Sequence, residues 1–201
     1  MTPGRMTAPL GAVAIVVMLS GCGGGKTVTS DGTSKATATN VVARVQNVPI
    51  TLSEYDHWSA VAQCSSSKSG SPCTATGPSS RTHDEVLAFL ISSAWVEAEA
   101  AERHLQLSPQ DIETQYQRIK RQQFPHVAEF QRFLSSSHQT EDDLRHRVRL
   151  NLLSTRIQHQ LRRSGGVAAI KELTSTFKAR WQPRTYCLPE FMVADCGHQI
   201  G

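Results

Sequence analysis

Apolar residues recur at every third or fourth position along much of the chain, which is the pattern of amphipathic α-helices. Thr82 and Glu85 have the spacing of a capping box, so we expect a helix to begin there. The apolar stripe that follows is the clearest in the chain and consists of Leu87, Leu90, Ile91, Ala94, Trp95 and Ala98. The pattern therefore predicts a mainly α fold with this helix in its core.

Helix-start and helix-stop signals divide the remaining periodic segments. Thr51 and Glu54 predict a second capping box, and the helix that they start should reach about Gln63. Ser108 is the expected N-cap of a third helix, which Pro125 should end. Three further stripes predict a short helix with Phe130, Phe133 and Leu134 inward, a helix from Thr140 with Leu144, Val148, Leu152 and Leu161, and a last helix with Ile170, Leu173, Phe177 and Trp181.

The segment Ser164-Gly165-Gly166 lies between the last two predicted helices. Arg162 and Arg163 come directly before it. Cations followed by glycines are typical of a helix end, because the cations favour the negative end of the helix dipole and glycine can leave the helical conformation. We therefore expect a turn between two helices at this segment.

Short segments near both ends of the folded region have a strand-like pattern. Val41–Val45 shows a weak alternation of side-chain character that predicts a short strand, and Asn47–Pro49 has the composition of a turn. Thr185–Cys187 and Phe191–Val193 are two further extended candidates, and either could pair with the first strand. Such pairing would join the N- and C-terminal ends of the domain in a small β element.

The first residues have the pattern of a signal peptide. Arg5 is followed by the apolar run APLGAVAIVVML, which is shorter than the roughly 20 residues of a membrane-spanning helix. The sequence Leu19-Ser20-Gly21-Cys22 resembles the bacterial lipobox, which predicts cleavage before Cys22 and acylation of that cysteine. The alternative is an ordinary signal peptide whose cleavage region happens to contain Cys22.

These signals divide the chain into three parts. We expect residues 1–21 to be the signal peptide and residues 22–40, which are rich in Gly, Ser and Thr, to be a flexible tether. Residues 41–201 should form one domain. With an acylated Cys22, the protein would be lipid-anchored to the cell membrane on its extracytoplasmic face.

Four of the five cysteines remain once Cys22 is assigned to acylation, and in an exported chain they predict disulfides. Three connectivities are possible. We favour Cys64 with Cys73 and Cys187 with Cys196, because each pair spans a short loop that contains proline and polar turn residues. A thiol redox site or a metal site is the rival interpretation, but the chain has neither a C-x-x-C motif nor a Cys/His ligand spacing.

Composition and charge argue against several classes of function. The chain has 21 Lys and Arg against 17 Asp and Glu, a net charge of +4, and the basic residues are scattered among acidic ones. Nucleic acid is therefore not a predicted partner. No histidine pair has the H-x-x-x-H spacing, and the chain contains no nucleophile-elbow or nucleotide-binding motif. We accordingly predict no metal, no cofactor and no catalytic residue.

Several stretches resemble exported foldases of the SurA and PrsA type. VARVQNVPITLSEY is similar to the family's opening strand, turn and helix, with Ile50, Thr51 and Glu54 at matching positions. Asn47 stands in place of the usual turn glycine and tolerates left-handed geometry nearly as well. Two later stretches resemble the helices that follow in this family, namely EVLAFLISSAWVEAEAAERHLQLSPQDIETQYQRIK and FQRFLSSSHQTEDDLRHRVRLNLL. A third stretch resembles the C-terminal end of actinobacterial lipoprotein foldases, namely FKARWQPRTYCLPEFMVADC. The resemblance implies a SurA N-terminal or trigger-factor-like helical chaperone domain.

Foldases of this family usually carry a parvulin-type prolyl isomerase domain, and residues 162–166 occupy its place here. This segment is far too short to hold such a domain, so we expect no isomerase catalysis and no enzyme. The resemblance then implies a holdase or foldase accessory that binds unfolded or partly folded exported proteins weakly and without ATP. Trp58 and Phe130 are candidate client contacts, although helical spacing explains both as core residues; no client-binding residue is assigned.

Two alternatives stay open at this point. The first is a structural or interaction lipoprotein that binds one dedicated protein partner with the same helical scaffold. The second is a divergent peptidyl-prolyl isomerase with an unrecognised active site. Suppression of the aggregation of unrelated proteins would argue against the first alternative, and a proline-isomerisation assay decides the second.

Overall fold

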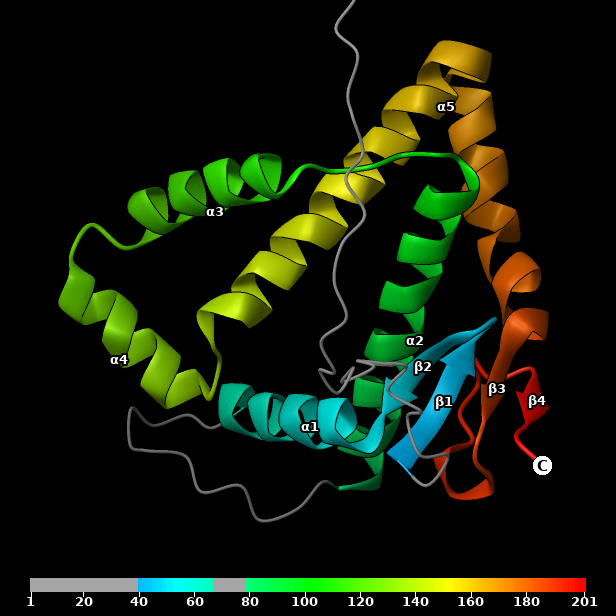
Figure 1. Cartoon of the computed structure of the whole chain (residues 1–201), viewed down its shortest axis with the longest axis horizontal. Helices are drawn as coiled ribbons and strands as arrows, with labels where there is room; N and C mark the ends of the chain where they lie inside the picture. Colours follow the sequence, from blue (N-terminus) through cyan, green and yellow to red (C-terminus); the bar gives the residue numbers. More distant parts are fainter. Residues whose placement is uncertain (1–39, 67–78) are drawn as a thin grey trace, which may run out of the picture. The chain divides into compact units, whose positions relative to one another are not determined.

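Helices dominate the computed structural model, which describes residues 40–66 and 79–201 (Figure 1). The predicted signal peptide, Cys22, nearly all of the predicted tether and Cys73 lie outside the described residues. In chain order the elements are β1 (Val41–Val45), β2 (Val48–Thr51), α1 (Leu52–Ser66), α2 (Ser80–Glu102), α3 (Pro109–Gln123), α4 (Val127–Ser137), α5 (Glu141–Trp181), β3 (Thr185–Cys187) and β4 (His198–Gln199). The structure therefore confirms a mainly α fold with a small β element.

Side-chain caps fix where the helices begin, and three of them match the sequence prediction. At α1, the Glu54 N–H donates to Thr51 Oγ1 at 3.2 Å and the Thr51 N–H donates to Glu54 Oε2 at 2.8 Å. Ser108 and Thr140 form the same reciprocal capping box at α3 and α5, each with the aspartate three residues later. Local side-chain chemistry alone therefore sets these three starts.

The capping box predicted from Thr82 and Glu85 does not form. Instead, Ser79 Oγ accepts the Thr82 N–H at 3.2 Å and serves as the N-cap, so α2 begins at Ser80. Glu85 forms an ion pair with Arg81 on the same helix, at 2.8 Å. In the predicted capping box, the Glu85 carboxylate would accept the Thr82 N–H. The prediction was wrong because the Ser79 hydroxyl accepts this N–H group instead.

The last long helix, α5, reverses direction at Gly166. The φ of 67° and ψ of −153° at Gly166 lie outside the helical region, in a conformation that only glycine adopts readily. Residues 141–165 run up to this point and residues 167–181 run back beside them (Figure 1). We call this arrangement the α5 hairpin, and its turn lies at the predicted segment Ser164-Gly165-Gly166.

The sheet joins the two ends of the described domain, with the strand order β2-β1-β3-β4. β1 pairs antiparallel with β2 and with β3, and Ala43 lies opposite Cys187 in the second pairing. β3 pairs parallel with β4. Of the two extended candidates in the sequence, Thr185–Cys187 is thus the one that pairs with the first strand. A disulfide joins Cys187 to Cys196, as we favoured.

Two details of this region differ from the sequence prediction. Phe191–Val193 is not a strand, because Pro189–Phe191 forms a 3-10 turn whose leading proline suits a turn and cannot donate to a β ladder. The left-handed residue between β1 and β2 is Gln46, with a φ of 52°, and not Asn47. β2 then begins directly after Asn47, earlier than the predicted turn allows.

Three buried clusters form the core. The first joins the sheet, α1, α2 and the end of α5 around Trp58, Trp95 and Trp181. The second fills the α5 hairpin and its contact with α2. The third lies between α3, α4 and the first half of α5 around Tyr116 and Phe130. Trp58 and Phe130, with exposed fractions of 7% and 1%, are therefore core residues. Within the described ranges, no helix has both the length and the apolar character to cross a membrane.

Candidate functional site

A cleft opens between β2, α1, α2 and the start of α5, and its volume is about 410 Å³. Ile50, Trp58 and Leu90 are buried core residues that also line it, so its floor is apolar. Val48 of β2 lines it as well, and this side chain is 54% exposed. The cleft therefore offers apolar contact to a side chain that enters from solvent.

His57 and Asp143 hold the α1 wall of the cleft against the α5 wall. His57 Nε2 lies 2.8 Å from Oδ1 and 2.9 Å from Oδ2 of Asp143. The same carboxylate accepts the Thr140 N–H at 2.7 Å, which is part of the cap of α5. One carboxylate thus fixes both the start of α5 and its position relative to α1.

Acidic side chains line the cleft above its apolar floor. Glu54 is engaged in the cap of α1, and Glu97 bonds Arg149 at 2.8 Å. Asp142, whose side chain is 93% exposed, bonds Arg145 at 3.1 Å. None of the described residues that line the cleft is Lys or Arg. Each of these carboxylates is already bonded by a group of the chain itself, so the cleft lining gives no reason to prefer segments with Lys or Arg over segments with Asp or Glu.

A second hollow of about 540 Å³ adjoins the cleft, because Asp142 and His146 line both. Pro109 and Ile112 bring α3 to the other side of this hollow. Cleft and hollow together form one concave surface that extends from β2 to α3, which we call the cradle. Its walls come from five elements that are far apart in the chain.

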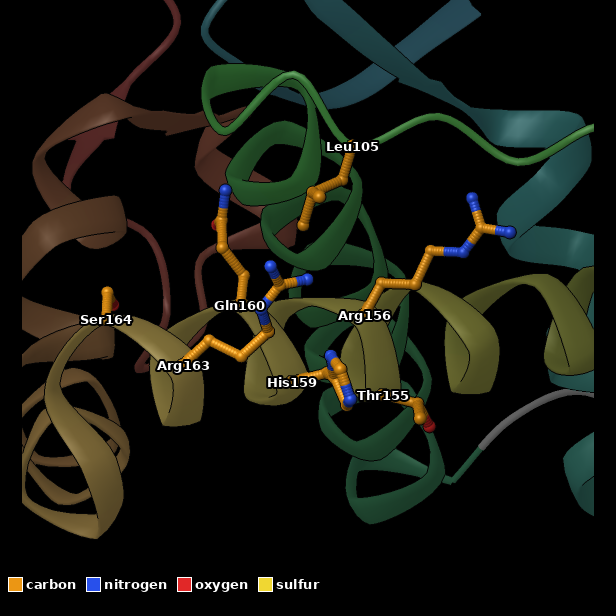
Figure 2. Close-up of a pocket in the computed structure, with 7 residues that line it drawn as sticks. All are labelled: Leu105, Thr155, Arg156, His159, Gln160, Arg163 and Ser164. Carbon is orange, nitrogen blue, oxygen red and sulfur yellow. The ribbon is translucent and has the colours of Figure 1, made fainter.

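A separate pocket of about 720 Å³ lies along the first half of the α5 hairpin (Figure 2). Arg156, His159 and Arg163 line it together with Thr155, Gln160 and Ser164, and Leu105 comes from the loop after α2. We call this pocket the basic groove. Its lining residues are entirely different from those of the cradle.

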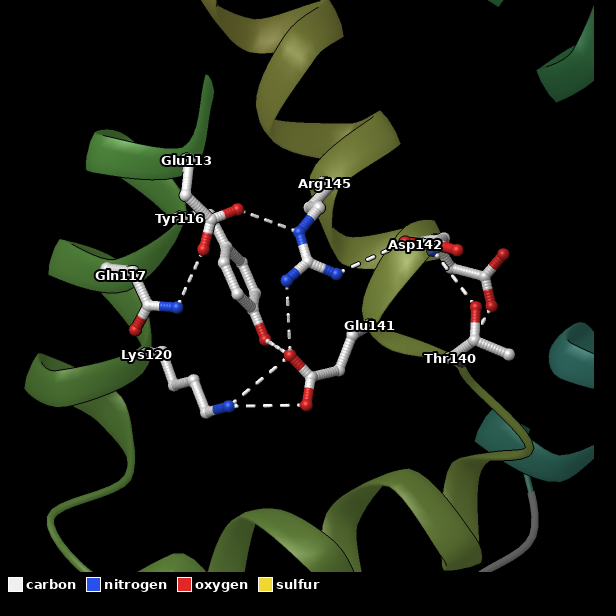
Figure 3. A network of polar contacts seen from close by, with 9 residues as sticks. Glu113, Tyr116, Gln117, Lys120, Thr140, Glu141, Asp142 and Arg145 are labelled. Atoms are coloured by element: carbon white, nitrogen blue, oxygen red, sulfur yellow. Dashed lines mark hydrogen bonds and ion pairs between the residues drawn. The ribbon is translucent and has the colours of Figure 1, made fainter. Parts of the chain in front are cut away.

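A polar network holds α3 against the start of α5 at one end of the cradle (Figure 3). Glu141 accepts a hydrogen bond from the Tyr116 hydroxyl at 2.6 Å and one from Lys120 Nζ at 3.3 Å. Arg145 donates from Nε to Glu113 at 2.9 Å. These bonds make the position of α3 depend on charged groups at the start of α5.

The network shifts the pKa values of its members. The hydrogen bond from Tyr116 is the main cause that lowers the pKa of Glu141. The hydrogen bond from Arg145 is the main cause that lowers the pKa of Glu113, and the same bond raises the pKa of Arg145. Burial, followed by the bond to Glu141, raises the pKa of Tyr116 far above its usual range. All four shifts favour the charge states that hold the network together at neutral pH.

Of the five cysteines for which the sequence predicts acylation or disulfide bonds, the structure describes only Cys64, Cys187 and Cys196. Cys22 and Cys73 lie outside the described residues, so the acylation of Cys22 and the pairing of Cys64 with Cys73 stay predictions. Cys64 is buried at the end of α1, and Cys187 and Cys196 are bonded to each other at the sheet. In residues 40–66 and 79–201, no group of three or more His, Cys, Asp or Glu side chains could hold a metal ion.

Sequence reasoning missed the cradle almost completely. Of its lining residues, only Trp58 was a candidate contact, and it contributes to the buried floor. The signal that could have pointed to the cleft is Val48 beside Pro49, because a proline in a strand places that strand at a sheet edge and leaves its apolar neighbour open to partners.

A family model described as the SurA-like N-terminal domain matches residues 5–158. No curated protein and no solved structure matches the chain.

Proposed function

The chain belongs to the SurA-like N-terminal domain family, which is chaperone-like, and we propose that it is a lipid-anchored extracytoplasmic holdase. It would bind unfolded or partly folded exported polypeptides and keep them from aggregating, without prolyl isomerase catalysis. The observation that carries this proposal is the cradle, with an apolar floor, an exposed Val48 and walls drawn from β2, α1, α2, α3 and α5.

The dimensions of the cradle support short extended segments as its ligands. A cleft of about 410 Å³ accommodates a few side chains and excludes a folded domain. Its floor offers apolar burial, which is non-directional and so accepts many sequences. Weak and broad binding of this kind suits a holdase that must release its clients without ATP.

The proposed anchor rests on the lipobox-like sequence that ends at Cys22. Two or more acyl chains on one cysteine give stable attachment, whereas a single chain gives only marginal binding. Cys22→Ser should therefore release the protein from the membrane fraction into the extracytoplasmic soluble fraction. Unchanged membrane retention of this variant would contradict the anchor.

The proposed absence of isomerase catalysis rests on the α5 hairpin. By resemblance, a parvulin domain would enter between the two halves of this hairpin, and the chain instead reverses within Gly165 and Gly166. A proline-isomerisation assay on the purified protein tests this directly. A rate above that of the uncatalysed reaction would contradict the proposal and favour a divergent isomerase.

The holdase activity itself is tested by light scattering from several unrelated proteins as they aggregate after dilution from denaturant. The wild-type protein should delay aggregation of all of them. Val48→Glu replaces an exposed apolar contact of the cleft with a charged side chain, so it should weaken this activity without disturbing the core. Val127→Glu is the matched control, because Val127 is 76% exposed on α4 and does not line the cradle.

Two results would overturn the holdase proposal. Equal activity of the Val48→Glu and Val127→Glu variants would remove the cleft from client binding. Failure of the wild-type protein to suppress any aggregation, together with saturable binding of a single exported protein, would instead identify an interaction lipoprotein with one dedicated partner.

A further inference from the structure

The basic groove has the chemistry of an anion site. Arg156, His159 and Arg163 line it with Thr155, Gln160 and Ser164, and every one of these side chains can donate a hydrogen bond (Figure 2). None of the described residues that line it is Asp or Glu. With a volume of about 720 Å³, the groove is large enough for a phosphate group and the polar atoms attached to it.

Internal ion pairs account for only part of the positive charge in and around the groove. Arg156 bonds Asp111 at 2.8 Å and also donates to the Gln106 carbonyl. Arg162, Arg163 and Lys171 form no ion pair with any residue in the described part of the chain. Of these three, only Arg163 lines the groove, whereas Arg162 and Lys171 lie elsewhere on the α5 hairpin. All three remain available to an external anion.

The sequence of the hairpin reinforces the charge of the groove. Residues 156–177 contain four Arg or Lys residues and a single acidic residue, Glu172. The rest of the chain mixes its charges much more evenly, with 17 acidic residues in all. Positive charge is thus concentrated at the α5 hairpin although the net charge of the chain is only +4.

An exposed apolar residue lies at the turn of the same hairpin. Val167 is 74% exposed and directly follows Gly166, where the chain reverses. The role of Arg162 and Arg163 at the end of a helix explains why cations occur there, but it does not explain an apolar side chain left in solvent at the tip. Cations beside an exposed apolar tip are the combination that binds an anionic lipid surface, where the cations contact phosphates and the apolar residue enters the interface.

We propose that the α5 hairpin docks on an anionic phospholipid surface, with lipid phosphates in the basic groove and Val167 in the interfacial layer. This site is independent of Cys22 acylation and of client binding, because it uses none of the residues of the cradle. It would orient a tethered protein so that one end of α5 faces the membrane. An acidic polypeptide is a less fitting ligand, because it offers nothing for Val167 to enter.

The test is co-sedimentation with vesicles of phosphatidylglycerol and phosphatidylcholine, compared with vesicles of phosphatidylcholine alone. The chain from residue 22 onward with Cys22→Ser is suitable, since it lacks the apolar run and the acyl chains but keeps the compact unit 36–201. It should bind the anionic vesicles at low salt, and high salt should weaken the binding. Arg162→Glu/Arg163→Glu should reduce the affinity at least about tenfold, and Val167→Ser about threefold.

The double variant Arg118→Glu/Arg121→Glu is the matched control, because it makes the same charge change at exposed positions of α3. It should lose much less affinity than Arg162→Glu/Arg163→Glu. An equal loss in both double variants, or equal binding to both kinds of vesicle, would overturn the proposal. Complete competition by inorganic phosphate would assign the groove to a small free anion instead. Tighter binding to polyglutamate than to anionic vesicles would assign it to an acidic polypeptide.

Discussion

Trp181 donates its indole N–H to Oε2 of Glu99 at 3.0 Å, across 82 residues of sequence. Both side chains are completely buried. Arg103 bonds the other carboxylate oxygen at 2.6 Å, and Arg180 approaches it at 3.5 Å. The last residues of α5 thus complete a buried charge site that begins on α2. The two halves of the α5 hairpin therefore belong to one folded core.

Replacement of Glu99 should be among the most destabilising single changes. Glu99→Ala leaves two guanidinium groups and an indole N–H without their buried acceptor, so we expect the free energy of unfolding to fall by about 3 kcal/mol. Glu99→Gln keeps an acceptor for Trp181 and should cost less. Urea unfolding followed by tryptophan fluorescence measures both.

Glu85→Ala is the control for this experiment. Glu85 pairs with Arg81 on the exposed face of α2, with side-chain exposures of 62% and 88%, and solvent screens such a pair so strongly that its loss should barely change the stability. A comparable loss of stability in Glu85→Ala and Glu99→Ala would show that the buried site does not hold α2 and α5 together.

Gly166→Ala should destabilise the α5 hairpin by about 1–3 kcal/mol, because an L-residue at a φ of 67° and ψ of −153° is strained. An added Cβ would meet no atom within 4 Å, so the cost comes from the backbone alone. Gly201→Ala is the matched control, since its Cβ also meets no atom and its φ is not positive. Equal urea midpoints for the two variants would contradict the assigned turn geometry.

Local signals predicted much of the fold, and the reasons are visible at particular residues. The boxes at Thr51, Ser108 and Thr140 depend on atoms within one turn of helix, so the sequence contains all the required information. Thr82 has the same local pattern, but it is not the N-cap, because its N–H group donates to the Ser79 hydroxyl and not to the Glu85 carboxylate. Which of Ser79 and Thr82 becomes the N-cap depends on the residue at which the backbone becomes helical, and the sequence pattern does not specify that residue.

The candidate site depended on tertiary structure that no local pattern specifies. His57 and Asp143 are 86 residues apart, and their bond forms only because α1 packs beside the start of α5. Trp58 was correctly placed in the core by its spacing, yet its contribution to the cleft floor requires β2, α2 and α5 around it. The turn of the α5 hairpin, in contrast, was predictable, because two adjacent glycines interrupt a helical pattern.

Acid should weaken the contact between α3 and the start of α5. The pKa values of Glu113 and Glu141 are lowered in the folded protein from their ordinary value of about 4.5. A lowered folded pKa contributes stability that is present above about pH 4.5 and is lost as the pH falls through the lower folded value. We therefore expect the urea midpoint to decrease steadily from pH 5 toward pH 3.

Glu141→Gln separates this effect from general acid denaturation. The variant can no longer change charge at this position, so its stability should be lower at neutral pH and should depend less steeply on pH between 5 and 3. Circular dichroism of urea unfolding at each pH measures the slope. A slope equal to that of the wild-type protein would exclude Glu141 as a source of the acid sensitivity.

The start of α2 gives a direct test of the cap that the sequence pattern misplaced. Ser79→Ala removes the oxygen that accepts the Thr82 N–H, so it should lower the free energy of unfolding by about 1 kcal/mol. Thr82→Ala leaves that acceptor in place and removes only a hydroxyl 2.8 Å from Ser79 Oγ, so its cost should be clearly smaller. Thermal unfolding of the two variants compares them directly. A larger loss in Thr82→Ala would mean that α2 begins at Thr82, with Glu85 in the capping box after all.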